Sequence, residues 1–306
     1  NKQMIAHNDF IWYNGVGDNM LYLKSFNLPN KGREENTLLH DIRTYIQGIY
    51  PYNIFPNKKL KEINFSPITI FYGGNGSGKS TLLNIIAEKI GVMRNNPFAG
   101  GERFDSYLKL CDFELTNNIP YEKKAISSDD IFDYVINIRR INHGLYNRRS
   151  EVVKEYIDSK YRPAREITDY QEMVDAVDAR HKTMSRFIRD KVIVKDIQEQ
   201  SNGESALMYF STYIADNGLY ILDEPENSMS ASMQIKLAKF IEDSARFFNC
   251  QFIIATHSPF ILGIKDATIY DLDSIPSVTK NFAELENMQV YYEFFKLHAQ
   301  EFTKNN

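Results

Sequence analysis

The stretch Gly73-Gly74-Asn75-Gly76-Ser77-Gly78-Lys79-Ser80-Thr81 decides how the rest of this chain is interpreted. The spacing of its glycines, lysine and serine matches a phosphate-binding loop, in which tight turns present backbone N–H groups to phosphate oxygens. The apolar run Ile68–Tyr72 precedes it and predicts a buried strand. Residues 80–90 follow as an amphipathic helix, which Gly91 is expected to end. Strand, loop and helix in this order favour a phosphate site over a plain glycine-rich turn.

Three side chains at the end of this loop are candidates for contact with a nucleotide, whose phosphates the backbone of residues 73–78 would cradle. Lys79 would neutralise the β- and γ-phosphates as a point charge, and Ser80 would ligate Mg²⁺ through its hydroxyl. Thr81 could hydrogen-bond a more inward phosphate. We therefore expect ATP and Mg²⁺ as cofactors.

A second acidic element follows the apolar run at 219–222, which predicts a strand that ends in Asp223 and Glu224. Asp223 would hold the Mg²⁺ shell, and Glu224 would orient or deprotonate the attacking water. Strand ends often carry solvated or helix-capping acids, so this pattern is weak without the phosphate-binding loop. Together with that loop, it predicts a metal-linked hydrolase.

A histidine follows a third apolar run, at residues 252–255. His257 would lie where this strand leaves the sheet, which is the edge at which open α/β folds bind ligands. There it could sense or stabilise the γ-phosphate. A lone histidine after a strand is more often structural, but the two motifs upstream favour the functional interpretation.

The segment Ser201-Asn202-Gly203-Glu204 resembles the signature segment of ATP-binding-cassette ATPases, with Asn202 in place of a glycine. By itself it is also a capping box. The order of all these motifs is similar to that superfamily. The resemblance implies a head-to-tail homodimer with two ATP at the interface, in which Ser201, Gly203 and Glu204 of one copy contact the nucleotide of the other.

The text DEPEN at 223–227 resembles the soluble branch of this superfamily. The stretches SSDDIF at 127–132, QSNGES at 200–205 and ATHSP at 255–259 resemble a group of small standalone bacterial ATPases. The resemblance covers about residues 20–275. Related groups are the chromosome-maintenance, recombination-mediator and overcoming-lysogenization-defect ATPases, which implies a role in DNA repair or phage defence. The nuclease domain that the last group appends leaves no trace in the sequence.

The predicted fold is an α/β P-loop NTPase of ATP-binding-cassette type. A mostly parallel central sheet would carry an N-terminal antiparallel β subdomain and a helical insertion. We divide the chain into residues 1–126 (first half of the core), 127–195 (insertion) and 196–306 (second half). Residues 20–72 predict short strands and loops. The other expected elements are helices at 129–158, 168–190 and 233–248, and strands at 219–222, 251–255 and 268–272.

The charge is unevenly distributed along the chain. The whole sequence carries 36 basic and 40 acidic residues, a net charge of −4. Residues 139–195 hold 14 Lys and Arg against 9 Asp and Glu, a net of +5. This basic insertion is either a solvated helical face or a surface that binds DNA or a protein partner. The basic residues singled out for phosphate contact are Arg139, Arg140, Arg148 and Arg149.

Several features limit the cellular setting and leave alternatives open. No apolar run approaches the length of a membrane span, and two cysteines are too few for a disulfide framework, so we expect a cytoplasmic protein. An ATP-driven dimerisation switch is the leading hypothesis. A transporter's nucleotide-binding subunit and an ATP-binding scaffold with little turnover are the alternatives.

Two parts of a nucleotide site are left without a firm assignment. Asp129 or Asp130 could replace the glutamine that contacts Mg²⁺ in the family, or simply cap a helix. Tyr50, Tyr52 or Phe55 could stack on adenine, although most aromatic residues belong to a core.

Overall fold

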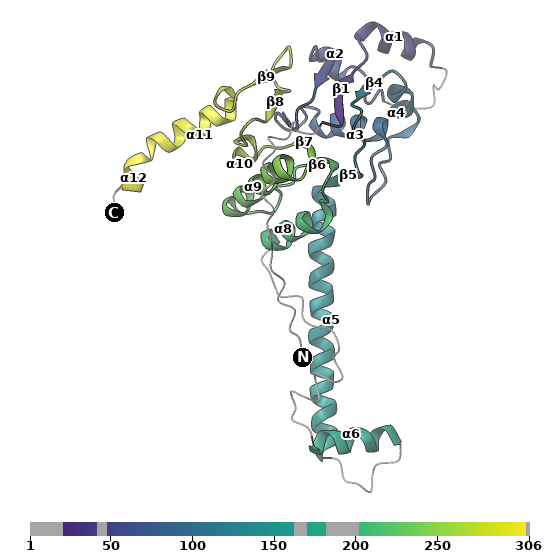
Figure 1. The fold of residues 1–306 in the computed structure, drawn as a ribbon, viewed down its shortest axis with the longest axis vertical. Coiled ribbons are helices and arrows are strands. Elements are labelled where there is room, and N and C mark those ends of the chain that lie inside the picture. The colour runs from purple at the N-terminus through teal and green to yellow at the C-terminus, as the bar shows by residue number, and fades with distance from the viewer. Residues whose placement is uncertain (1–20, 42–47, 162–169, 182–201, 304–306) are drawn as a thin grey trace.

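The computed structural model describes residues 21–41, 48–161, 170–181 and 202–303 (Figure 1). Its centre is a six-stranded sheet, in which every pairing is parallel except the last, β8 with β9. The strands, in spatial order, are β5 (Glu122–Ser127), β6 (Gly218–Asp223), β7 (Gln251–Ala255), β3 (Ile68–Tyr72), β8 (Thr268–Asp271) and β9 (Val278–Lys280). The phosphate-binding loop leaves β3, which lies inside the sheet between β7 and β8.

A second, three-stranded sheet is antiparallel, with β1 at its centre. Its strands are β1 (Leu23–Asn27), β2 (Glu62–Asn64) and β4 (Asp112–Leu115). The predicted fold class is therefore confirmed: a mostly parallel sheet is combined with an N-terminal antiparallel subdomain. The core runs between the two sheets because Ile63 and Phe26 pack in the same apolar cluster as Phe71.

Helix α3 (Lys79–Ile90) carries the phosphate-binding loop into the core. Its apolar stripe is buried as predicted, in the cluster between the two sheets. Gly91 ends the helix with φ 66°, a left-handed conformation that suits glycine. On the opposite face of the central sheet lie α8 (Asn202–Tyr213), α9 (Ala231–Phe247) and α10 (Pro259–Leu262).

The predicted insertion begins with one long helix, α5 (Ser128–Tyr161), which projects from the sheet edge (Figure 1). Helix α6 (Tyr170–His181) packs against its far end through Val152, Tyr156 and Ala179. The expected helix at 129–158 is thus confirmed. The predicted helix at 168–190 corresponds to α6 in its first part, and residues 182–190 lie outside the described residues. The domain limits at 126/127 and 195/196 stay a proposal.

The prediction of short strands and loops for residues 20–72 was wrong in two places, because helices α1 (Lys31–Leu39) and α2 (Ile54–Asn57) lie within this range. Helix α1 begins after Asn30, whose side chain accepts a hydrogen bond from the Arg33 N–H. The turn signal Pro29-Asn30 is therefore a helix start. The remaining helices are α4 (Gly101–Leu108), α11 (Glu286–Leu297) and α12 (Ala299–Thr303), with a 3₁₀ turn at Phe282–Glu284.

Candidate functional site

The phosphate-binding loop is shaped by its own glycines. Gly76 and Gly78 have φ of 79° and 93°, which side-chain-bearing residues rarely adopt. At Gly73 an added Cβ would lie 2.6 Å from the Ser77 hydroxyl oxygen. Gly78 occupies the N-cap position of α3 without a side-chain hydrogen bond, so the first N–H groups of this helix are left for an anion.

Lys79 is almost fully buried at the base of the loop, with 5% of its surface exposed. Its Nζ donates to the carbonyl oxygens of Gly73 at 2.7 Å and Gly74 at 3.2 Å. Burial lowers the pKa of Lys79, while the nearby carboxylates of Glu224 and Asp223 act in the opposite direction. The loop therefore holds one compact positive charge where phosphates would bind.

Ser80 and Asp223 form the pair expected to hold Mg²⁺. The Ser80 hydroxyl donates to Oδ1 of Asp223 at 3.1 Å across the gap between α3 and β6. Burial raises the pKa of Asp223, and the hydrogen bond from Ser80 lowers it. Among the described residues, no cluster of three or more His, Cys, Asp or Glu side chains could hold a metal unaided. Such a donor pair fits Mg²⁺, which binds through one or two protein oxygens together with phosphates and water.

His257 and Glu224 come together with Lys79 at the carboxyl ends of β6 and β7. His257 Nε2 lies 2.9 Å from Glu224 Oε1 and 3.1 Å from Lys79 Nζ. Nε2 can donate to the carboxylate or accept from the ammonium group, but one nitrogen cannot do both. The two contacts are therefore alternatives, and the histidine can exchange one for the other. The structure brings together these three side chains, each of which the sequence analysis named as a candidate.

Backbone geometry places Glu224 for this contact. It has φ 47°, and its N–H donates to the Ala255 carbonyl at 2.9 Å, which ties it to the neighbouring strand β7. Asn227 Nδ2 donates to Glu224 Oε2 at 3.2 Å. Both carboxylate oxygens of Glu224 thus have a partner, and one of those partners is the histidine.

Glu226 holds the histidine segment in place, a role that the sequence analysis missed. Its Oε1 accepts three hydrogen bonds: from the Thr256 hydroxyl at 2.6 Å, from the His257 N–H at 2.9 Å and from the Ser258 N–H at 3.1 Å. The side chain is buried, and its other oxygen has no hydrogen-bond partner among the described residues. The signal for this role in the sequence was the second glutamate of DEPEN, because a strand end that is exposed to water does not require an acidic side chain.

Replacing Glu226 by alanine should lower kcat about 10- to 100-fold and change KM for ATP less than about threefold, because His257 would lose its fixed position while the phosphate-binding loop stays intact. Glu226→Gln should recover part of kcat, since its amide oxygen still accepts hydrogen bonds. Steady-state phosphate release measures both values. Glu62→Ala, which removes an exposed acid on β2, is the control. A proportional loss of kcat and ATP affinity would show that Glu226 supports the fold only.

The three aromatic candidates for adenine stacking are now separated. Tyr52 and Phe55 are buried in the core and cannot reach a ligand. Tyr50 is 44% exposed, and its hydroxyl lies 3.3 Å from Thr81 Oγ1 at the start of α3. Its ring stacks on Phe104 at a centroid distance of 6.0 Å. Of the three residues, Tyr50 is therefore the one for which stacking on adenine stays a prediction.

The two acidic candidates for the position near Mg²⁺, at the base of α5, also differ in burial. Asp130 is buried, and its Oδ2 accepts from the Ser127 N–H and hydroxyl, both at 2.8 Å. It is a helix-capping residue, in agreement with the structural alternative. Asp129 and Asp130 both line the same pocket as Asp223, but Asp129 is exposed. Asp129 thus stays a candidate for the position near Mg²⁺.

The signature-like segment is only partly described. Ser201 lies outside the described residues, and α8 begins at Asn202, with Gly203 and Glu204 in its first turn. The buried residues of α8 pack on one face of the central sheet, and those of α3 pack on the other. The start of α8 and the phosphate-binding loop of the same chain therefore belong to different layers.

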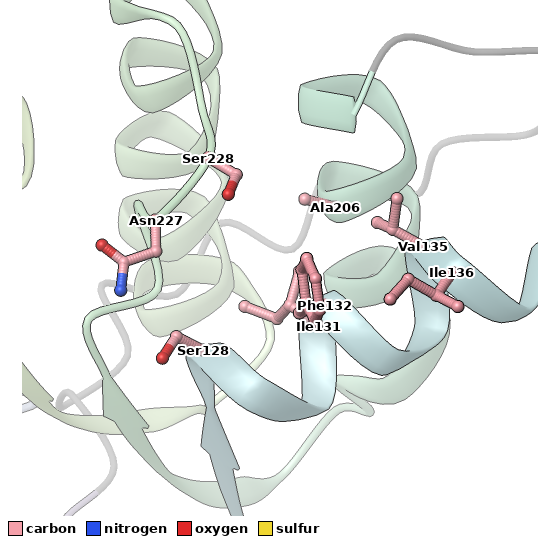
Figure 2. A pocket seen from close by; sticks show the side chains of 8 residues that line it. All are labelled: Ser128, Ile131, Phe132, Val135, Ile136, Ala206, Asn227 and Ser228. Atoms are coloured by element: carbon pink, nitrogen blue, oxygen red, sulfur yellow. The ribbon is translucent and has the colours of Figure 1, made fainter.

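A cleft lies where α5 and α8 meet the loop that follows β6. Figure 2 shows the apolar side chains of Ile131, Phe132 and Val135 near Ala206 of α8, with Asn227 and Ser228 on the facing loop. Asn227 is the residue that donates to Glu224. Asn227 therefore contacts Glu224 and also lines the cleft at the base of the long helix.

The cysteines take no part in this site. Cys111 and Cys250 are both free and buried. Burial raises the pKa of the Cys111 thiol to about 12 and that of Cys250 to about 11. Both thiols stay protonated at neutral pH, as expected of inert core residues.

Comparison with known proteins assigns the chain to a family and finds distant relatives. The family described as "AAA domain, putative AbiEii toxin, Type IV TA system" matches residues 100–263, more than half of the chain. The tungstate uptake system ATP-binding protein TupC of Campylobacter jejuni is 22% identical over 269 residues, which cover 80% of this chain and 72% of that protein. The maltose/maltodextrin import ATP-binding protein MalK of Vibrio vulnificus is 22% identical over 200 residues, 64% of this chain and 45% of the transporter protein.

Among solved structures, the Smc head domain of Pyrococcus furiosus, bound to the C-terminal domain of ScpA, matches with 14% identity and a TM-score of 0.40. The match covers 90% of this chain and all of that one. The fold and the motifs define a P-loop ATPase of ATP-binding-cassette type. The chain belongs to the AAA family whose model matches residues 100–263. None of the helices in the described parts of the chain is both long and apolar enough to cross a bilayer.

Proposed function

We propose that this protein binds and hydrolyses ATP as a head-to-tail homodimer, and that closure of the dimer drives a conformational switch in a bound partner or in DNA. The observation that carries the proposal is the meeting of Lys79, Glu224 and His257, with 2.9 and 3.1 Å contacts on one imidazole nitrogen. ATP hydrolysis is also what the family and its curated relatives suggest. A role in DNA repair or phage defence is part of the same proposal.

The residues would divide the chemistry between them. Residues 73–81, which include Lys79, hold the phosphates. Ser80 and Asp223 would hold Mg²⁺, which neutralises charge on the phosphate oxygens. Glu224 accepts the proton of the attacking water. His257 would contact the γ-phosphate in the tautomer that carries its proton on Nε2, the form that donates to Glu224, because a nitrogen that accepts from Lys79 has no proton to donate.

The second copy is needed to complete the nucleotide site. Asn75 and Gly76 at the tip of the loop are exposed. The signature-like start of α8 belongs to the opposite face of the sheet from α3. A nucleotide on the loop would therefore have one open side, and Ser201, Gly203 and Glu204 of another copy would cover it. Asn227 contacts Glu224 and lines the cleft at the base of α5, so it would transmit the closure of the dimer to this long helix.

The basic insertion could bind DNA through contacts with its phosphates. These contacts would come from Arg139, Arg140, Arg148 and Arg149. If about six phosphates are bound, affinity for a DNA duplex should fall roughly 1,000-fold between 50 and 200 mM salt. A gel mobility assay with ATP measures this, and changing these arginines to glutamate should abolish the shift. Charge reversal at Lys24 and Lys31 of the antiparallel subdomain and α1 is the control. A complete lack of binding would assign the switch to a protein partner.

The second candidate function is that of a transporter's nucleotide-binding subunit. It is favoured by the names of the relatives, which are ATP-binding proteins of tungstate and maltose uptake systems. In that case α5 and α6 would contact a membrane partner. Recovery of the chain in the membrane fraction of its native cells, released by detergent and not by salt, would support this alternative.

A further inference from the structure

The C-terminal helices form an arm that leaves the body of the protein (Figure 1). Leu285 and Met288 anchor its start in the core, and the N–H of Asn287 donates to the Tyr72 hydroxyl at 3.2 Å. Beyond Met288, every large apolar side chain up to Thr303 is exposed, by between 45% and 81%. These side chains are Val290, Tyr291, Tyr292, Phe294, Phe295, Leu297 and Phe302. Among the described residues, none covers these apolar side chains, and an exposed apolar patch of this kind often marks a site of interaction.

All but one of the aromatic residues of this arm line one face; Tyr292 lies outside it, beside Lys296. Tyr291, Phe294, Phe295, His298 and Phe302 recur at spacings of three and four, and we call them the C-terminal stripe. Their rings touch: Phe294 lies 5.6 Å from Phe295 and 4.7 Å from His298, and Phe295 lies 6.4 Å from Phe302, between centroids. The stripe is therefore one continuous aromatic surface.

Two charged residues of the arm lie away from the stripe, whereas a third, Glu301, lies at its edge. Glu293 and Lys296 form an ion pair at 3.9 Å, and their helical positions place them on the opposite face. Glu301 pairs with His298: its Oε1 lies 2.7 Å from Nδ1 of the histidine. The surface that covers the stripe must therefore be apolar as well.

We propose that the stripe binds the same stripe of a second copy of this chain, in antiparallel two-fold pairing centred between Phe294 and Phe295. In that register Phe294 faces Phe295 of the other copy, and Tyr291 faces its His298, so the surface complements itself. The seven exposed apolar side chains of the arm together offer on the order of 800 Å² per copy, at about 150–250 Å² for each fully exposed aromatic residue. The four aromatic side chains of the stripe are 45–67% exposed and supply roughly 450 Å² of this, over half of the area that one partner contributes to a standard interface.

The charges of the arm argue against two other occupants. Between residues 286 and 303 there are three acids, Glu286, Glu293 and Glu301, against one base, Lys296. Helices that lie on membranes are usually rich in Lys and Arg on the polar face. Nucleic acid requires positive charge. A neutral aromatic stripe backed by acids fits another copy of itself.

This pairing differs from the ATP-dependent dimer because it uses no residue of the nucleotide site. It would keep two copies together between rounds of ATP binding. It would also raise the local concentration of one nucleotide site near the other.

The mass of the full chain in solution without nucleotide tests the proposal. Sedimentation equilibrium should give a dimer at micromolar concentration, and Phe294→Glu with Phe295→Glu should raise the dissociation constant more than about 30-fold, as loss of central aromatic contacts does. Leu39→Glu, at an exposed apolar residue of α1, should stay dimeric. Since no nucleotide is present, the result does not depend on the proposed ATP-driven dimer.

Circular dichroism and ATP binding would verify that the double variant is folded. The milder Phe294→Ala should shift the dissociation constant in the same direction. A monomer of unchanged sequence at about 100 μM would overturn the proposal, and so would a dimer that both variants leave intact. Flotation of a monomer with phosphatidylcholine vesicles would assign the stripe to a lipid surface and would overturn it as well.

Discussion

Replacing Glu224 by glutamine is expected to lower ATP turnover about 100- to 10,000-fold and to leave ATP affinity within a few-fold of the unchanged protein. Glutamine keeps the size of the side chain and its hydrogen-bonding reach toward His257 and Asn227, which lie 2.9 and 3.2 Å from the two carboxylate oxygens. It cannot take a proton from water. The loss should therefore fall on kcat, measured by phosphate release.

The matched control is Glu122→Gln on the edge strand β5, where the carboxylate lies 3.4 Å from the Tyr220 hydroxyl and away from the nucleotide loop. Its turnover should stay within about twofold of the unchanged protein, as surface substitutions usually do. Nucleotide retained by the Glu224 variant after rapid gel filtration should be ATP, whereas the unchanged protein should retain ADP. Unimpaired turnover in the Glu224 variant would remove this residue from the mechanism.

The central sheet and its phosphate site could be predicted because they depend on local patterns. A buried parallel strand is a continuous apolar run, and the loop between β3 and α3 needs glycine where φ is positive. The strands β3, β6 and β7 were recognised for this reason. The meeting of Ser80 with Asp223 then follows from topology, since the carboxyl ends of parallel strands lie at one edge of a sheet.

Other features depend on contacts between distant residues and could not be predicted in this way. Strand β5 reads Glu122-Lys123-Lys124 at its start, a charged pattern that only its edge position in the sheet permits. Glu226 acquires its role through three donors about thirty residues away. Helix α11 has apolar residues on several faces, so periodicity alone does not reveal which side packs.

Lys79→Ala and Ser201→Arg are each expected to abolish ATP turnover, for different reasons. Without Lys79, the loop loses the buried charge that faces the phosphates and the Nζ contacts with the Gly73 and Gly74 carbonyls. At position 201, arginine would place a long cation where a second copy's nucleotide is to be covered. Each variant should keep less than about 1% of the rate, the usual scale for losing a main electrostatic contact in such a site.

The most direct test of the account is co-expression of these two inactive variants in equal amounts. In a head-to-tail dimer, a mixed pair has one site built from an intact loop on the Ser201→Arg chain and an intact signature segment on the Lys79→Ala chain. Half of randomly formed dimers are mixed and each has one such site, so turnover should recover to about a quarter of the unchanged rate. Turnover no greater than that of the separate variants would contradict a site shared between two copies.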